Sequence, residues 1–350
     1  MSPILNVALV GYGFAGSVLH APLLAHTPGI RLHSVVSCDA AKVHADHPDV
    51  RVVADAGAAF ADPAIDLVVI AAPNRAHASL ACAALLAGKH VVVDKPFTVT
   101  FAEAQEVIAT AAGARRLISV FQNRRWDADF LAVQQLLADL TLGEVMEFHS
   151  HFDRYRPDVA DRWREQDQPG SGLWYDLGPH LLDQALQLFG MPITVSADIG
   201  LQRGASNAPD YFHVLLRYPR LRVVLHAGSL VPAHGLRFAV HGTQGSYLKH
   251  GLDAQENRLR CGGVPGQPGW GTDPSPGELH LATDHGIELT SGPPTTGDYR
   301  HYYAAMREAI VHASAVPVLP DEALQVMALL EWGVLSSLER REVACTALQP

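Results

Sequence analysis

Lys95, Asp176 and His180 are the side chains of this 350-residue sequence best suited to acid–base chemistry. Lys95 comes just after the apolar residues 90–93, and a lysine at the end of a strand could polarise a carbonyl oxygen or transfer a proton. Asp176 and His180 stand four positions apart, so they would share one face of a helix. The imidazole could then accept a hydroxyl proton while the carboxylate orients it or balances its charge.

Each of these residues also has a purely structural interpretation. Lys95 could be a surface lysine in a loop, and only its place after a strand favours chemistry. Asp176 and His180 could be two polar residues on the exposed side of a helix. Pro179 complicates that helix, because a proline in a helix interior removes a hydrogen bond and kinks the chain. Either the helix starts near Leu177, with Pro179 in its first turn, or it is bent.

A glycine-rich turn near the N-terminus is typical of a dinucleotide-binding site. Gly11, Gly13 and Gly16 form a GxGxxG pattern between a short apolar strand, residues 6–10, and a helical run that ends near residue 25. The first glycine allows the tight turn, the second lets the backbone approach a pyrophosphate, and the third lets the helix pack against the strand. The start of the helix offers N–H groups to the phosphates. The other cofactor contacts expected in this turn are Tyr12, Phe14 and Ala15.

The end of the second strand, about 20 residues further on, should contact the adenosine ribose. There the sequence has Ser37 and Cys38, with Lys42 within reach. A small hydroxyl group and a nearby lysine favour NADP, and NAD is the alternative. An aspartate at the strand end would repel a 2′-phosphate, but Asp39 comes two residues later and is expected to cap the helix that starts at Ala40.

Two further segments are expected at the same edge of the sheet. Ala72, Pro73 and Asn74 follow an apolar strand at residues 66–72, and Asp94 and Lys95 follow the next strand. Ligands of open α/β folds bind at the carboxyl ends of the strands, so we expect these five residues to contact the cofactor. His77 is a further candidate contact, although its simplest role is to begin the next helix.

The order of strand-like and helix-like patterns predicts two domains. Over residues 1–122 they alternate, as in a parallel sheet with crossover helices. The strands expected there are 6–10, 31–36, 50–53, 66–72, 90–93 and 117–121. The expected later elements are a helix at 130–139, a strand at 144–152, a helix that opens at the glycine-rich entry 170–172 and runs to 189, strands at 195–199, 211–218, 222–229 and 236–241, a loop at 262–277, and helices at 302–313 and 321–340. The predicted fold class is an α/β Rossmann domain, residues 1–122, followed by an α+β domain, residues 123–350, with a mostly antiparallel sheet.

Composition and charge exclude several classes of protein. The chain carries 26 Lys and Arg against 36 Asp and Glu, and this net charge of −10 argues against nucleic acid or an anionic membrane as a partner. No stretch approaches the ~20 apolar residues of a membrane helix, and the first residues do not look like a secretory signal. The four cysteines lie far apart and are expected to be reduced thiols of a cytoplasmic protein. They are Cys38, Cys82, Cys261 and Cys345.

The 19 histidines raise the question of a metal site. His149 and His151 alternate along a predicted strand and would share a face. Because no HExxH motif and no Cys/His cluster accompanies them, we expect no metal ligands. The sequence also lacks a Gly-x-Ser-x-Gly elbow and an identifiable pair of glycosidase carboxylates, which argues against hydrolysis.

Together these motifs resemble those of the Gfo/Idh/MocA family, which includes glucose–fructose oxidoreductase and inositol dehydrogenase, over nearly the whole chain. Besides the glycine-rich turn, the resemblance rests on a "PN…H" segment, an "AL.aGKHV..EKP" signature and a "GGG…D.G.H..D" signature. Asp94 replaces the commoner glutamate, and Ser171 replaces the middle glycine. The matching residues are Pro73, Asn74, His77, Ala84, Leu85, 87–91, 94–96, 170–172, Asp176, Gly178, His180 and Asp183.

The resemblance implies roles for the candidate residues. Lys95, Asp176 and His180 match the family's catalytic lysine, aspartate and histidine, and the Lys95–Pro96 bond is often cis in the family. The second domain is implied to be a substrate-binding domain with a large open sheet. The face of that sheet commonly packs against a partner subunit, so a homodimer or a larger homo-oligomer is expected.

Three segments resemble a bacterial branch of the family with NADP-type scyllo-inositol dehydrogenase-like members. They are residues 123–125, 152–157 and 270–271. This branch implies a polyol or sugar substrate. Its hydroxyl groups would meet polar side chains such as Arg124, Asp153 and Tyr155, together with the three catalytic residues.

The expected function is therefore that of an NAD(P)-dependent dehydrogenase acting on CH–OH groups of a sugar or cyclitol. His180 would be the base, Lys95 an electrostatic and proton partner, and Asp176 an orienting group. The alternative is a dinucleotide-binding sensor without turnover on the same fold. The glycine-rich turn is common to both, and the intact trio of Lys95, Asp176 and His180 favours the enzyme.

Overall fold

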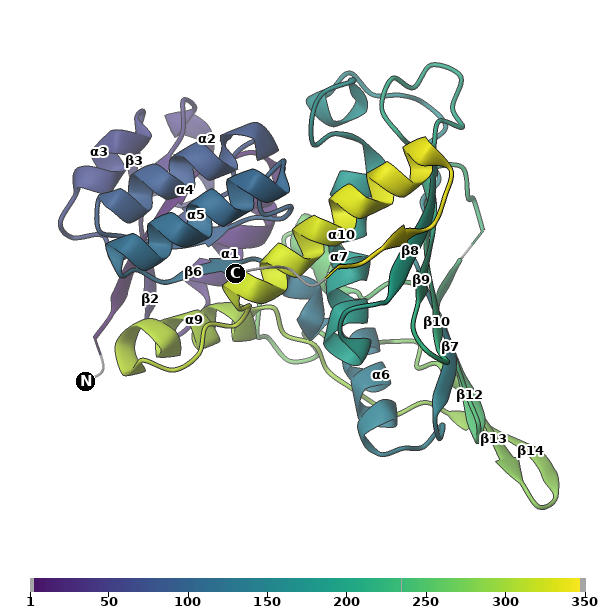
Figure 1. Cartoon of the computed structure of the whole chain (residues 1–350). Coiled ribbons are helices and arrows are strands. Elements are labelled where there is room, and N and C mark those ends of the chain that lie inside the picture. The colour runs from purple at the N-terminus through teal and green to yellow at the C-terminus, as the bar shows by residue number, and fades with distance from the viewer. Residues whose placement is uncertain (1–2, 234, 347–350) are drawn as a thin grey trace. The chain divides into compact units, whose positions relative to one another are not determined.

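Two compact units make up the chain in this computed structural model, which describes residues 3–233 and 235–346 (Figure 1). The first unit runs to Trp126 and also takes in two later segments, Gln255–Trp270 and Asp298–Leu324. The second unit contains Asp127–Ala254, Gly271–Gly297 and the chain from Gln325 onward. The sequence pattern predicts two continuous domains, residues 1–122 and 123–350, and does not predict that later segments of the chain join the first unit.

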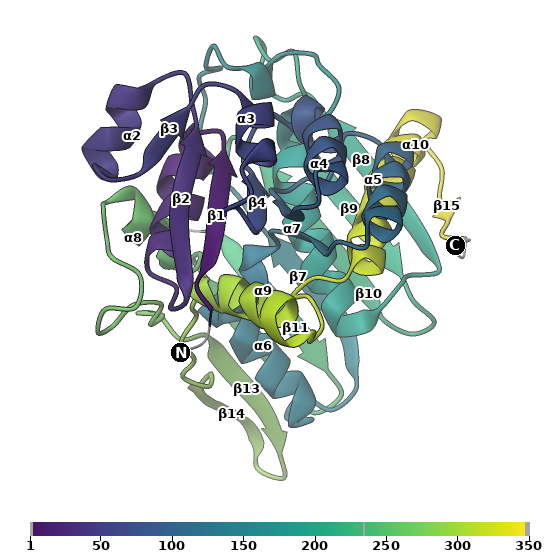
Figure 2. The same cartoon turned by 90° about the vertical axis from the view of Figure 1, so that its left-hand side faces the viewer.

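A six-stranded parallel sheet forms the centre of the first unit. Its strands are β1 (Leu5–Val10), β2 (Ile30–Val36), β3 (Arg51–Val53), β4 (Leu67–Ile70), β5 (His90–Val93) and β6 (Ile118–Val120). Their order is β3-β2-β1-β4-β5-β6, and Figure 2 shows β3, β2 and β1 side by side. The order reverses between β1 and β4, which is the switch point where open α/β sheets bind ligands. The predicted Rossmann fold is confirmed.

Apolar residues bury the middle strands of this sheet on both faces. All four residues of β4 are buried, as the unbroken run Leu-Val-Val-Ile predicts. The helical segments of this unit are η1 (Ala15–His20, a π-helix), α1 (Ala21–Ala25), α2 (Ala40–Asp46), α3 (Ala56–Ala61), η2 (Asn74–Ala76), α4 (His77–Leu86), α5 (Phe101–Ala114), η3 (Asn123–Trp126), α8 (Gln255–Arg260) and α9 (Arg300–His312). A capping box of Thr100 and Glu103 starts α5.

A nine-stranded sheet forms the second unit. Its strands are β7 (Val145–His151), β8 (Thr194–Gly200), β9 (Tyr211–Arg217), β10 (Arg222–Gly228), β11 (Leu236–Gly242), β12 (Gly245–His250), β13 (Glu278–Thr283), β14 (Gly286–Ser291) and β15 (Val343–Ala344). They lie in the order β14-β13-β12-β11-β7-β10-β9-β8-β15. The sheet is mostly antiparallel, as predicted, but β7 and β10 pair in parallel. In Figure 1 the β13–β14 hairpin forms the far end of the sheet.

Helix α7 (Gly172–Phe189) carries the predicted acid–imidazole pair of the second unit. The unit also contains α6 (Ala128–Ala138), η4 (Trp163–Glu165) and most of α10 (Pro320–Glu339). Helix α7 begins at Gly172, as the glycine-rich entry at residues 170–172 predicts, so the alternative start near Leu177 is excluded and Pro179 lies inside the helix. No helix among the described residues is both long enough and apolar enough to cross a membrane.

Candidate active site

The glycine-rich turn has the shape that a bound dinucleotide requires. Gly11 has a φ of +98°, and a Cβ there would lie 2.5 Å from the carbonyl oxygen of Ala71 on the neighbouring strand end. A Cβ on Gly16 would collide with the carbonyl of Gly11, so the start of the helix packs directly on the turn. At Gly13, by contrast, a Cβ would meet nothing within 4 Å. The backbone at Gly13 thus leaves space for a pyrophosphate, and the residues fit the cofactor.

Tyr12 connects this turn to helix α2. Its hydroxyl donates to Asp46 at 2.9 Å, and the Lys42 ammonium donates to the Tyr12 carbonyl at 3.0 Å. Burial and the hydrogen bond that its hydroxyl donates to Asp46 raise the pKa of Tyr12. The Lys42 side chain therefore lies beside the glycine-rich turn, where it could meet a 2′-phosphate.

Ser37 follows β2 directly, as predicted. Its hydroxyl accepts a hydrogen bond from the Asp39 amide at 3.1 Å. The Asp39 carboxylate accepts from the Lys42 amide at 2.9 Å and so caps α2, which confirms the predicted capping role. Cys38, between them, is exposed.

The segments after β4 and β5 lie at the same edge as the glycine-rich turn. Val10, Ile70 and Val93 are neighbours across the sheet, so the residues that follow them leave it at one level. His77 joins the two later segments. Its Nδ1 lies 2.9 Å from the Pro96 carbonyl and its Nε2 lies 2.9 Å from the Ala72 carbonyl. These contacts give His77 a structural role.

Asp94 is a buried carboxylate beside the candidate lysine. It accepts a hydrogen bond from the Lys95 amide at 2.8 Å, and its Oδ1 lies 3.7 Å from the His20 Nε2. Burial disfavours the charged carboxylate, but the charges of His20 and Lys95 outweigh it, and the pKa of Asp94 falls to about 2. Asp94 therefore carries a fixed negative charge next to the half-buried Lys95. The Lys95–Pro96 bond is cis, as the resemblance implies.

His20 is held in turn by a residue from a later segment of the chain. Its Nδ1 lies 2.5 Å from the hydroxyl of Tyr303 on α9. Phe121, directly after β6, packs against both rings, with centroid distances of 4.4 Å to His20 and 5.5 Å to Tyr303. A chain of contacts thus runs from α9 through His20 and Asp94 to the backbone of Lys95.

Asp176 and His180 share one face of α7, as their spacing predicts. The Asp176 carboxylate pairs with two arginines, at 3.0 Å from Arg154 and 3.3 Å from Arg164. Two guanidinium groups hold this carboxylate in one orientation. The His180 side chain is buried. Asp176 is therefore better suited to positioning and charge balance than to taking up a proton.

The start of α7 explains the Gly-Ser-Gly segment. Gly170 and Gly172 have φ angles of +77° and +82°, and a Cβ on Gly172 would lie 2.9 Å from the carbonyl oxygen of Pro209. Ser171 between them has a φ of −91°. Only the two outer positions need glycine, so a serine in the middle leaves the backbone unchanged.

The predicted substrate contacts Arg124, Asp153 and Tyr155 lie in different surroundings. Arg124 is buried and pairs with Glu256 of α8. Asp153 faces two imidazoles of the second unit, and Tyr155 is 59% exposed beside the strand-like pairing it makes with Leu230.

The structure thus brings the predicted residues together in two groups. One is the edge with the glycine-rich turn, residues 72–74, Asp94 and Lys95, and the other is the α7 face with Asp176 and His180. The meeting of Lys95 with His180 stays a prediction, since the two belong to separate units. Sequence reasoning missed the partners His20, Arg154 and Arg164, although Arg154 stands in the segment 152–157 that the resemblance had marked.

Comparisons with known proteins agree with this architecture. The model described as "Oxidoreductase family, NAD-binding Rossmann fold" matches residues 5–122, and that described as "Oxidoreductase family, C-terminal alpha/beta domain" matches residues 134–345. The uncharacterized oxidoreductase YdgJ of Escherichia coli (strain K12) is 50% identical over 99% of this chain and 100% of its own length. The scyllo-inositol 2-dehydrogenase (NADP(+)) IolW of Bacillus subtilis (strain 168) is 38% identical over 97% and 95%.

Among solved structures, the YPO2259 putative oxidoreductase from Yersinia pestis superposes with a TM-score of 0.96 and 49% identity, covering 100% of this chain and 99% of that one. The putative oxidoreductase yvaA from Bacillus subtilis also has a TM-score of 0.96, at 36% identity, with 99% of each chain covered. Both comparisons extend over the whole described fold.

Proposed function

The chain belongs to the Gfo/Idh/MocA family of oxidoreductases, and on this premise we propose that it is an NADP-dependent dehydrogenase of a sugar or cyclitol. The observation that carries the proposal is the position of Lys95. It follows β5 at the edge that also holds the glycine-rich turn, beside the buried charge of Asp94. Ligands of such folds bind at this edge. An inositol-like substrate is supported by the 38% identity to IolW, whose name gives NADP and scyllo-inositol.

The proposed chemistry divides the work among the chain's own residues. His180 accepts the proton of the substrate hydroxyl, Lys95 donates to the oxygen as it becomes a carbonyl, and Asp176 orients the substrate and balances charge. Bound NADP+ would supply the acceptor for the hydride that leaves the same carbon. Residues 11–16, Ser37, Lys42 and 72–74 would hold the dinucleotide. Arg124, Asp153 and Tyr155 remain candidate contacts for the other hydroxyl groups.

Steady-state kinetics on a panel of cyclitols, aldoses and ketoses with NADP+ and NAD+ tests the proposal. Lys95→Ala and His180→Ala should each lower kcat by roughly 100-fold or more, because each removes a proton-transfer or electrostatic partner. Titration with NADPH, followed by its fluorescence, should show nucleotide binding retained. His312→Ala, at an exposed position at the end of α9, is the matched control and should keep full activity.

Near-normal turnover in either catalytic variant would contradict the assigned roles. Tight NADPH binding by the unaltered chain with no oxidation or reduction of any compound in the panel would favour the alternative, a dinucleotide sensor on the same fold.

A further inference from the structure

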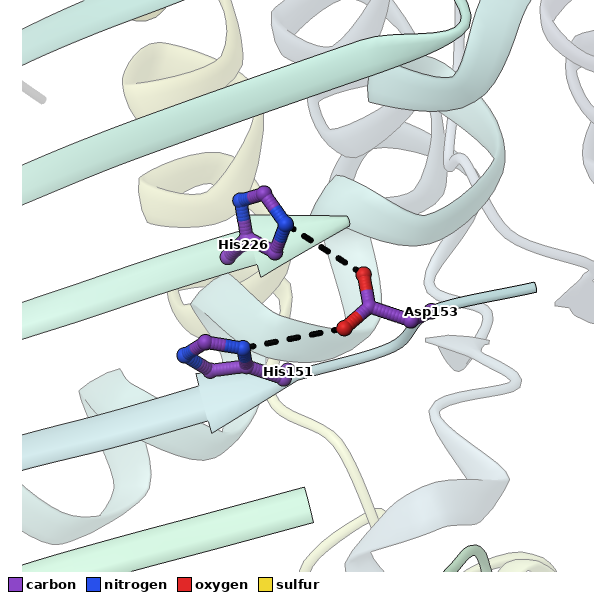
Figure 3. A group of neighbouring side chains, drawn as sticks. All are labelled: His151, Asp153 and His226. Atoms are coloured by element: carbon purple, nitrogen blue, oxygen red, sulfur yellow. Dashed lines mark ion pairs between the residues drawn. The ribbon is translucent and has the colours of Figure 1, made fainter. Parts of the chain in front are cut away.

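Three potential metal ligands meet on two neighbouring strands of the second unit (Figure 3). His151 is the last residue of β7, and His226 lies directly opposite it on the parallel strand β10. Asp153 follows β7 by two residues, and its carboxylate lies between the two rings (Figure 3). Its oxygens are 3.7 Å from the His151 Nδ1 and 3.3 Å from the His226 Nε2. One ligand atom from each residue lies within 4.8 Å of the others.

The surroundings favour a ligand role over an ordinary exposed cluster. The side chains of His151, Asp153 and His226 are 20%, 9% and 17% exposed, so the carboxylate charge is largely removed from water. The ring nitrogens that point away from Asp153, Nε2 of His151 and Nδ1 of His226, are buried without a hydrogen-bond partner among the described residues, so no second hydrogen bond there fixes the orientation of either ring. A charged carboxylate and two imidazoles in such a place need a compensating positive charge, which protons on the rings or a metal ion can supply.

Two glycines leave the space in front of the carboxylate open. A Cβ on Gly235 would lie 3.2 Å from Asp153 Oδ2, and a Cβ on Gly228 would lie 3.8 Å from both Asp153 Oδ1 and His226 Nε2. The Gly228 amide donates to Asp153 Oδ1 at 3.0 Å. This bond fixes the carboxylate in the way that outer hydrogen bonds orient metal ligands. A side chain at Gly235 would crowd the Asp153 carboxylate, whereas a Cβ at Gly228 would only be in ordinary van der Waals contact with the ligand atoms.

We propose that His151, Asp153 and His226 bind one divalent metal ion of the zinc class, with water completing its coordination. Zinc prefers imidazole and carboxylate ligands at about 2.0–2.1 Å in a tetrahedral arrangement, which places ligand atoms about 3.3 Å apart. The two separations to Asp153, 3.3 and 3.7 Å, are already close to this value. Because the histidines stand on paired strands, small side-chain rotations suffice to close the site.

This inference departs from the expectation of no metal ligands. The alternation along the strand indicates His149 and His151 as a pair, and their ring centroids lie 5.9 Å apart. The sequence motifs indicate no third metal ligand beside this pair. The missing ligands are a carboxylate just beyond the strand and an imidazole 75 positions after it in the sequence (226 − 151 = 75). Only the parallel pairing of β7 with β10 brings them together.

Isothermal titration of the full chain, purified without a histidine tag and stripped with a chelator, tests the proposal with Zn²⁺ as the probe. We expect one saturable site per chain. Asp153→Asn and His226→Ala should each weaken that site by about tenfold or more, by loss of a ligand. The matched control is His241→Ala on β11, whose ring bonds Ser246 at 2.8 Å, and it should bind Zn²⁺ like the unaltered chain.

Titration with Co²⁺ provides a second measurement, because its visible absorption bands report coordination directly. The bands should appear with the unaltered chain and with His241→Ala, and should be lost with His226→Ala. Thermal unfolding of each variant establishes that it is folded, and His151→Asn replaces Asp153→Asn if that variant is not. The proposal would be overturned if the unaltered chain did not bind Zn²⁺. It would also be overturned if the ligand variants bound Zn²⁺ as tightly as the unaltered chain.

Discussion

Ser37 directly follows β2, at the position where an acidic residue would contact the ribose 2′-hydroxyl of NAD. Its hydroxyl accepts the amide of Asp39, while the Asp39 carboxylate is used to cap α2. The Lys42 ammonium lies beside Tyr12 of the glycine-rich turn. This corner of the site therefore combines a neutral hydroxyl group with a positive charge, a combination that suits a 2′-phosphate.

Ser37→Asp should weaken the use of NADP selectively. A carboxylate at this strand end would repel a 2′-phosphate, and we expect a loss of roughly tenfold or more in kcat/KM with NADP+, or about 1.4 kcal/mol. With NAD+ the value should stay within about threefold. The control Ser37→Ala removes the hydroxyl group without adding charge, so comparison of the two variants with both cofactors isolates the electrostatic part. An equal loss with both cofactors would count against this interpretation of the strand end.

Residue types and spacing revealed some of the site but not its supports. The Asp39 cap and the shared helix face of Asp176 with His180 follow from local rules, and both are confirmed. The partners Arg154 and His20 could not be predicted in this way. Each reaches its carboxylate across a long separation in the sequence, and such contacts depend on tertiary packing that local patterns do not encode.

The second-unit helices are joined at Trp174, a fully buried side chain of α7. Its indole N–H donates to the Leu330 carbonyl of α10 at 3.0 Å. Glycines flank the ring on both sides, since a Cβ on Gly178 would lie 2.7 Å from it and one on Gly333 would lie 2.8 Å from it. Gly178, which lies between Asp176 and His180, thus allows α7 to pack closely against the Trp174 ring. This packing constrains the part of α7 that carries both polar residues.

Gly178→Ala should therefore destabilise the protein although alanine favours helices. The added methyl group would push against the Trp174 ring, and overpacking of this kind costs about 1–3 kcal/mol. The midpoint of urea unfolding measures the effect. The matched control is Gly113→Ala in α5, where a Cβ would meet nothing within 4 Å, and it should be neutral or stabilising by up to about 1 kcal/mol. Equal behaviour of the two variants would show that Trp174 does not constrain α7.

Elements were predictable where a periodic pattern coincided with a clear boundary. All six strands of the parallel sheet were expected close to their observed positions, because their apolar runs are bounded by turns. Strands β12, β13, β14 and β15 were not predicted. β14 is exposed along its whole length and so lacks the alternation of a strand with one buried face, and β13 adjoins a region rich in glycine and proline that was expected to be a loop.

The first unit depends on the segment Asp298–Leu324, which begins 172 residues after the main part ends at Trp126 (298 − 126 = 172). The hydroxyl of Ser119 on β6 donates to the Val318 carbonyl at 3.0 Å, and Arg307 of α9 donates to the Pro3 carbonyl at 3.1 Å. The fully buried Tyr303 reaches His20 beside the candidate lysine. These contacts could not be predicted from the sequence, because the amphipathic pattern of α9 indicates a helix but not the surface that it covers.

A fragment of residues 1–126 should consequently be less stable than the same residues in the whole chain. Without α9 the Phe121 ring and the His20 imidazole would face water, and the loss of such buried contacts costs several kcal/mol. Thermal unfolding and hydrogen exchange of the fragment, compared with exchange at the same amides in the intact protein, measure the difference. The same protection at the ends of β5 and β6 in both samples would refute this dependence.

The sign of φ alternates along residues 170–172, and this affects how relatives of this chain can be recognised. A search pattern that demands three consecutive glycines would miss this chain, although only Gly170 and Gly172 of the three residues have positive φ angles. Positions 170 and 172 favour glycine because of their positive φ angles. Position 171 has a negative φ and can hold other L-amino acids. A search for distant relatives should therefore require glycine at the two positions with positive φ and allow other residue types at the position between them.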